Sequence, residues 1–151
     1  MSEVSYKDFD ILSETDKAEA VALLNRYEQL EKQDSCQNDF ISFVNHMWPD
    51  FIEGRHHKII AEKFNRIAEG KLKRLIVCLP PRHSKSEFAS TFFPAWMMGR
   101  RGNLKIIQTT HTAELAVRFG RRVRNIIDSD EYQHIFPDLQ LQADNKSAVR
   151  S

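Results

Sequence analysis

The feature that most constrains this chain is a short apolar run that ends at two prolines, within RLIVCLPPRHSKSEFAS at residues 74–90. Because proline lacks a backbone N–H and fixes φ, the run at residues 75–79 must end at Pro80. An apolar run of this length, flanked by charge and proline, predicts a strand buried on both faces, as in a parallel sheet. A second run, LKIIQTT at residues 104–110, predicts another buried strand.

Apolar residues with helical spacing lie before, between and after these two runs. They predict helices at about residues 15–32, 38–48, 56–69, 85–98 and 112–128, the fourth interrupted near Pro94. The order of elements predicts an α/β protein: a P-loop NTPase-type three-layer fold with a mostly parallel sheet, incomplete and preceded by helices. Two strands are too few for a complete doubly wound sheet, so we interpret the chain as a fragment of a longer protein.

Charge is strongly segregated along the 151 residues. Residues 55–127 hold 16 basic and 4 acidic residues, a net charge of +12, whereas residues 1–54 hold 4 basic and 12 acidic residues, a net charge of −8. A basic middle favours a polyanionic partner such as nucleotide or nucleic acid. A solvated face that balances the acidic ends explains the same pattern equally well. No apolar run is long enough to span a membrane.

The residues after the first run have the composition of a phosphate-binding loop. Such a loop needs converging backbone N–H groups, a lysine for the β- and γ-phosphates, and a hydroxyl for Mg²⁺. Lys85 supplies the lysine and Ser86 supplies the hydroxyl. Arg82 adds a guanidinium able to form paired hydrogen bonds with phosphate oxygens. An ordinary turn is the alternative interpretation.

The loop lacks the usual glycines, and this restricts the backbone conformations that it can adopt. Pro80 and Pro81 have no N–H to donate. The donors must then come from the residues that follow: His83, Ser84, Lys85, Ser86 and Glu87. Ser84 replaces a glycine, which is tolerable only with negative φ or at a modest cost in strain.

The segment LIVCLPPRHSKSEFAS resembles the deviant Walker A segment of the large terminase subunits of tailed bacteriophages, which typically reads PPR-H-G-K-S-E. Ser84 departs from that pattern at its one glycine. The similarity continues upstream through a Trp-Pro and a histidine before a helix, and downstream through a Phe-x-Arg-x-Val-Arg helix. It covers about residues 38–150. Accordingly, we expect an N-terminal helical segment at residues 1–37 and the truncated N-terminal part of the ATPase domain at residues 38–151.

The resemblance implies an ATP-driven motor that moves double-stranded viral DNA into a procapsid. Lys85 and Arg82 would be catalytic, residues from Pro81 to Glu87 would bind ATP, Ser86 would hold Mg²⁺, and His56 and His57 would lie near adenine. The implied partners are the small terminase subunit, the portal protein and further copies in a ring. The implied location is the host cytoplasm and, transiently, the portal, without stable incorporation into the virion.

Hydrolysis also needs carboxylates that follow a hydrophobic strand. Asp128, Asp130 and Glu131 instead continue a helical pattern, which predicts a solvated helix end. We therefore expect the Walker B residues beyond Ser151, so that this chain alone does not turn ATP over. The alternatives are a helicase-like ATPase, a nucleotide kinase, or a non-catalytic remnant that serves as an interaction module.

Four arginines follow one another closely in the last predicted helix. They are predicted to contact DNA phosphates or a neighbouring subunit, or to form a charged outer face: Arg118, Arg121, Arg122 and Arg124.

Overall fold

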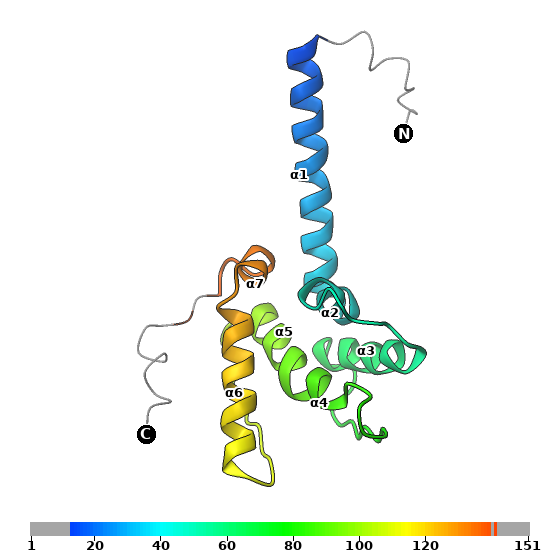
Figure 1. Ribbon diagram of the computed structural model, residues 1–151, viewed down its shortest axis with the longest axis vertical. Coiled ribbons are helices and arrows are strands. Elements are labelled where there is room, and N and C mark those ends of the chain that lie inside the picture. Colours follow the sequence, from blue (N-terminus) through cyan, green and yellow to red (C-terminus); the bar gives the residue numbers. More distant parts are fainter. Residues whose placement is uncertain (1–12, 140, 142–151) are drawn as a thin grey trace. The chain divides into compact units, whose positions relative to one another are not determined.

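The computed structural model describes residues 13–139 and 141. Within these residues all regular secondary structure is helical (Figure 1). In chain order the elements are α1 (Glu14–Asn38), α2 (Phe40–Met47), α3 (Arg55–Ala68), α4 (Lys85–Glu87), the π-helix η2 (Phe88–Phe92), α5 (Phe93–Arg100), α6 (Ala113–Ile127) and α7 (Asp130–Ile135). None of the helices in the described ranges combines the length and the hydrophobicity needed to cross a bilayer.

The chain divides into two compact units, one up to Gln33 and one from Asp34 onward. The described part of the first unit is the helical stretch from Glu14 to Gln33, and it confirms the helix predicted at residues 15–32. Its larger apolar side chains are exposed: Leu23, Leu24, Tyr27 and Leu30 expose between 55% and 61% of their surface. The predicted domain boundary at residue 37 stays a prediction.

The second unit is built around aromatic side chains of α2. Phe40 and Phe43 are fully buried. The ring of Phe40 makes edge contacts at 5.1 Å to Phe64 of α3 and at 5.4 Å to Phe88 of η2. Such edge-to-face pairs add to the free energy gained by burying apolar surface. Phe40 thus joins three helical elements into one core.

Local capping signals in the sequence fix the helix ends. The carboxylate of Asp39 accepts the Ser42 N–H at 3.0 Å and starts α2. Thr112 caps α6 in the same way. Beyond α3, Gly70 has a φ of 77°, the left-handed conformation that commonly follows a helix end. The helices predicted at these positions are confirmed.

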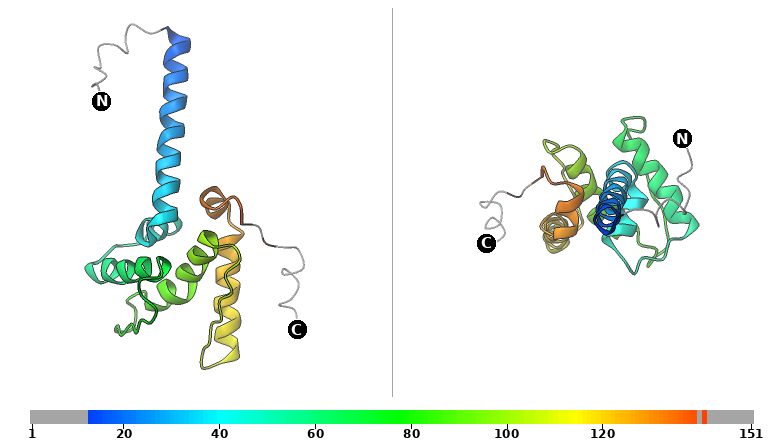
Figure 2. Two further views of the ribbon diagram at one scale, coloured as in Figure 1. Left: turned by 180° about the vertical axis from the view of Figure 1, so that it is seen from behind. Right: turned by 90° about the horizontal axis from the view of Figure 1, so that it is seen from above.

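Residues 85–100 form one continuous helical stretch that changes hydrogen-bonding pattern along its length. Five residues, the element η2, adopt the wider π-helical turn just before Pro94, which lies in the first turn of α5. A proline in a continuous helix removes one N–H donor, so a local rearrangement is expected there. The predicted helix is confirmed, but the predicted interruption is not: the hydrogen-bonding pattern changes before Pro94 while the helical stretch continues. The helix α6 packs against both η2 and α5 (Figure 2).

The predicted α/β P-loop-type three-layer fold is wrong, because the described residues contain no strand. Residues 75–79 have no regular secondary structure, and alternate side chains contact the core: Leu75, Val77 and Leu79 are half-buried, whereas Ile76 is 89% exposed. Cys78 is exposed too, although the apolar run predicted its burial.

The second run, at residues 104–110, is likewise unpaired, and Ile107 is 90% exposed. A strand is held by hydrogen bonds to a neighbouring segment, and a local apolar pattern does not specify that neighbour. Both strands predicted from these runs, and the sheet that they were to form, are therefore wrong.

Candidate functional site

The predicted phosphate-binding loop connects the apolar run at residues 75–79 to α4. The Phe88 N–H donates to the Ser84 carbonyl at 2.9 Å, so helical hydrogen bonding begins directly after the loop. The loop and the first helical turn surround a cavity of about 330 Å³. Its lining consists of consecutive residues: Pro80, Pro81, Arg82, His83, Ser84, Lys85, Ser86 and Glu87. All the ATP-binding residues predicted within the loop therefore meet at one concave surface.

Two residues of this loop have left-handed backbone conformations. Arg82 has a φ of 64° and Ser84 a φ of 54°. Left-handed residues alternating with right-handed ones turn successive N–H groups toward one side, which is the geometry of an anion-binding nest. For residues other than glycine this conformation costs roughly 1–2 kcal/mol each. Ser84 thus adopts the strained alternative considered from the sequence, and Arg82 adopts a conformation that the sequence did not reveal.

Most amide donors of the loop are free of protein acceptors. Within the described residues, the backbone N–H groups of residues 84–87 make no hydrogen bond to the protein, whereas the turn at residues 81 and 82 directs the His83 N–H toward the Pro80 carbonyl. The first amides of a helix have no partner within the helix itself, and the adjacent prolines contribute none. These amides are consequently available to the oxygens of a bound anion.

Positive charge and a hydroxyl lie beside these amides. Lys85 and Ser86 are both exposed and both line the cavity, as does Arg82. Mg²⁺ is commonly held by one or two protein oxygens together with phosphate oxygens and water. The Ser86 hydroxyl fits that role as a single ligand. No cluster of three or more His, Cys, Asp or Glu side chains suited to a metal occurs among the described residues.

The one acidic residue of the cavity lining is held by a distant arginine. Glu87 forms an ion pair with Arg122 of α6, and the two side chains are 34% and 39% exposed. Arg122 therefore faces the loop helix. The pair joins residues 35 positions apart, and no local pattern in the sequence signals such a contact.

The other three arginines predicted as a basic group in α6 differ in their exposure. Arg118 and Arg121 are exposed, and Arg124 is half-buried. Their contact with DNA or with a neighbouring subunit stays a prediction. Beyond the helix, Asp128, Asp130 and Glu131 are exposed at the end of α6 and the start of α7, so the predicted solvated helix end is confirmed.

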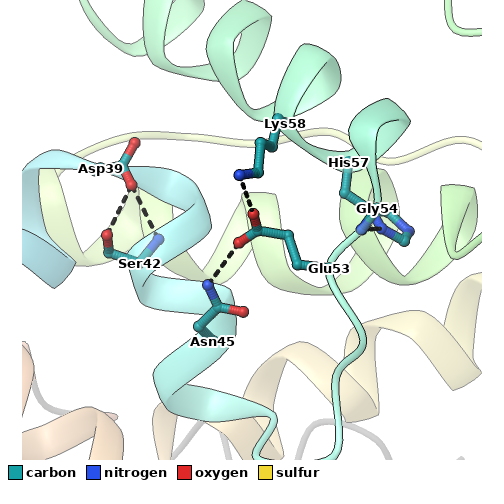
Figure 3. A network of polar contacts seen from close by, with 7 residues as sticks. All are labelled: Asp39, Ser42, Asn45, Glu53, Gly54, His57 and Lys58. Atoms are coloured by element: carbon teal, nitrogen blue, oxygen red, sulfur yellow. Dashed lines mark hydrogen bonds and ion pairs between the residues drawn. The ribbon is translucent and has the colours of Figure 1, made fainter.

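The two histidines predicted near adenine lie in the first turn of α3. The Gly54 N–H donates to Nδ1 of His57 at 3.0 Å, which caps the helix (Figure 3). Nδ1 is therefore an acceptor, and the neutral ring carries its proton on Nε2. Burial lowers the pKa of His57, and the neighbouring His56 lowers it further.

A carboxylate next to this cap partly offsets those effects. Glu53 raises the pKa of His57 by its negative charge. The Glu53 carboxylate also accepts from Asn45 at 2.9 Å and pairs with Lys58 at 2.9 Å (Figure 3). These contacts hold the segment before α3 against α2.

The histidine pair also contacts the phosphate loop. The ring centroid of His56 lies 3.8 Å from that of His57 and 5.4 Å from that of His83. The structure therefore brings the start of α3 and the loop together, and the adenine site at these histidines stays a prediction. The Nε2 atoms of His56 and His57 are buried, however, and find no hydrogen-bond partner among the described residues.

Sequence reasoning missed a second cavity of about 390 Å³ that shares Lys85 and Ser86 with the loop. Its other walls come mainly from apolar residues, which periodicity interprets as core. Comparisons with models of protein families, with curated proteins and with solved structures found no match to this chain.

Proposed function

We propose that residues 80–87 bind the triphosphate of ATP together with Mg²⁺. The observation that supports this most strongly is that residues with unpartnered amides, two left-handed residues and Lys85 all line one cavity. Oriented amides and a nearby cation are the groups that stabilise phosphate anions in proteins. Phosphate binding by such a loop does not require a parallel sheet.

Each polar side chain of the loop has a distinct role in this proposal. The Lys85 ammonium neutralises the β- and γ-phosphates, and the Ser86 hydroxyl supplies one ligand to Mg²⁺. The Arg82 guanidinium presents planar donors that match phosphate oxygens in pairs. Mg²⁺, when bound, neutralises phosphate charge and bridges the oxygens of the triphosphate.

A more specific proposal concerns the biological role: the chain is the ATPase portion of a viral DNA-packaging motor of the large-terminase type. It is supported by the order of residues in LIVCLPPRHSKSEFAS and by the basic helix that follows. The partners then proposed are double-stranded DNA, the small terminase subunit, the portal protein and further copies of the chain in a ring. The proposed location is the host cytoplasm and, transiently, the portal.

ATP binding without turnover is the activity proposed for this chain alone. Glu87 is the one carboxylate in the lining of the loop cavity, and it is engaged by Arg122. Polarising a water for attack on the γ-phosphate requires a suitably placed carboxylate or amide. We propose that such a group lies outside this chain, as the resemblance implies.

Titration of the chain with a fluorescent ATP analogue and Mg²⁺ tests the proposal. Lys85→Ala should weaken binding by at least about tenfold, since a charge-assisted hydrogen bond is worth about 1.5–3 kcal/mol. Lys73→Ala is the matched control, because Lys73 is exposed and lies outside both cavities. Equal affinity of the Lys85→Ala variant and the unchanged chain would refute the loop as the site.

A further inference from the structure

The second cavity adjoins the proposed phosphate site. It measures about 390 Å³, within the usual size range of small-molecule sites. Lys85 and Ser86 line both cavities, so the two are neighbours at the first turn of α4. The remaining lining residues are Phe64, Ile67, Leu75, Val77, Ala89 and Ser90.

The walls of this cavity are apolar and come from three different elements. Phe64 is 4% exposed, and its ring stacks on Phe93 with 4.2 Å between the centroids, which fixes its position in α3. Leu75 and Val77 belong to the apolar run at residues 75–79 and are half-buried. Ala89 of η2 is exposed at the rim. Such walls suit the face of a flat aromatic ring better than a further anion.

The backbone beside these walls is also free to bind a ligand. Among the described residues, residues 75–77 make no backbone hydrogen bond. Each of them carries one N–H donor and one carbonyl acceptor. The edge of a nucleobase carries complementary donors and acceptors.

From this arrangement we infer that the second cavity holds the base of the nucleotide whose phosphates occupy the loop. The inference rests on the proposed function and adds the location of the base. The wall residues Phe64, Ile67, Leu75 and Val77 provide apolar contact, and Lys85 and Ser86, which line both cavities, lie between the base and the phosphates. The base then lies away from His56 and His57, whose Nε2 atoms are buried.

The test compares ATP with inorganic triphosphate, which has no base, by calorimetric titration of the full chain in Mg²⁺. ATP should bind at least about tenfold more tightly, because even small differences in apolar contact change affinity by about 10–200-fold. Ala89→Phe fills the cavity from its rim and should reduce the affinity for ATP to that for triphosphate. The affinity for triphosphate itself should not change, which also shows that the loop remains intact.

Ala113→Phe is the matched control, since Ala113 is exposed and lies outside both cavities, so the same substitution there should leave both affinities unchanged. Ile67→Phe narrows the cavity from α3 and should act as Ala89→Phe does. Equal affinities of ATP and triphosphate for the unchanged chain would overturn the base site alone. A loss of ATP affinity in His57→Asn, but in neither cavity variant, would place the base at the histidines. If triphosphate does not bind at all, the proposed function fails and the base site fails with it.

Discussion

Arg122 of α6 forms an ion pair with Glu87, which lies two residues after Lys85 at the start of the loop helix. The pair crosses between α6 and the turn that holds the proposed phosphate site. It therefore couples a helix carrying the exposed Arg118 and Arg121 to the residues that would contact nucleotide.

The Glu87–Arg122 pair should contribute modestly to stability. Both side chains are partly exposed, and ion pairs in such positions contribute about 0.2–1 kcal/mol. We expect Glu87→Gln and Arg122→Gln each to lower the free energy of unfolding by about this amount. The double variant should lose less than the sum of the two single losses. Urea unfolding of all four proteins measures this coupling, and strictly additive losses would show that the two side chains do not interact.

Ser84→Gly should stabilise the protein. The φ of 54° at Ser84 costs roughly 1–2 kcal/mol for a residue with a Cβ and little for glycine, although glycine also makes the unfolded chain more flexible. We expect a net gain of about 0.5–1 kcal/mol in the free energy of unfolding. Ser86→Gly is the control and should destabilise, because Ser86 lies within α4. A loss of stability in Ser84→Gly would contradict the left-handed backbone.

Gly99→Ala should destabilise the packing of α5 against α7. A Cβ at Gly99 would lie 2.5 Å from the Phe136 ring and 2.7 Å from the Tyr132 hydroxyl. Both side chains are buried, so overpacking should cost about 1–3 kcal/mol. Gly120→Ala is the matched control. No atom lies within 4 Å of a Cβ there, and alanine should stabilise α6 by about 0.5–1 kcal/mol. Thermal unfolding distinguishes the two variants, because the melting temperature should fall in Gly99→Ala and rise in Gly120→Ala.

Stability should fall in mild acid because of His57. Burial holds the pKa of His57 below its ordinary value, with a contribution from His56 and a smaller one from His83, while Glu53 opposes them. A histidine with a lowered folded pKa binds protons more readily when unfolded. Its contribution to stability is therefore complete above about pH 6.5 and is lost as the pH falls further.

Urea unfolding at pH 7.5 and pH 5.5 measures this dependence. His57→Asn retains an acceptor for the Gly54 N–H but does not titrate, so it should reduce the loss of stability at the lower pH. His111→Asn changes an exposed histidine and serves as the control. An unchanged pH dependence in His57→Asn would show that another group causes the acid sensitivity.

The sequence predicted the helices because their signals are local. Asp39 and Thr112 cap helices through bonds to residues three positions ahead, and Gly70 follows the end of α3. The sheet failed as a prediction because strand pairing depends on distant segments. Leu75 and Ile76 are both apolar, yet one faces the core and the other faces solvent. Composition cannot separate these two environments.

The candidate site was predicted only in part, because some of its contacts are local in the sequence and others join distant segments. The order Arg82, Lys85, Ser86 identified the loop, since these residues are close in sequence. Packing of distant helices is needed for the contact of Arg122 with Glu87 and for the second cavity, which Phe64 lines. The left-handed conformation of Arg82 has no local signal either, because arginine rarely adopts it.

The central claim is that the amides of residues 84–87 converge on a bound anion. Chemical shifts of the backbone amides, recorded by NMR while inorganic triphosphate is added to the full chain, test it most directly. We expect saturable shifts concentrated at residues 84–87, and their loss in Lys85→Ala but not in Lys73→Ala. Shifts that do not saturate, or that leave these amides unaffected, would contradict the account.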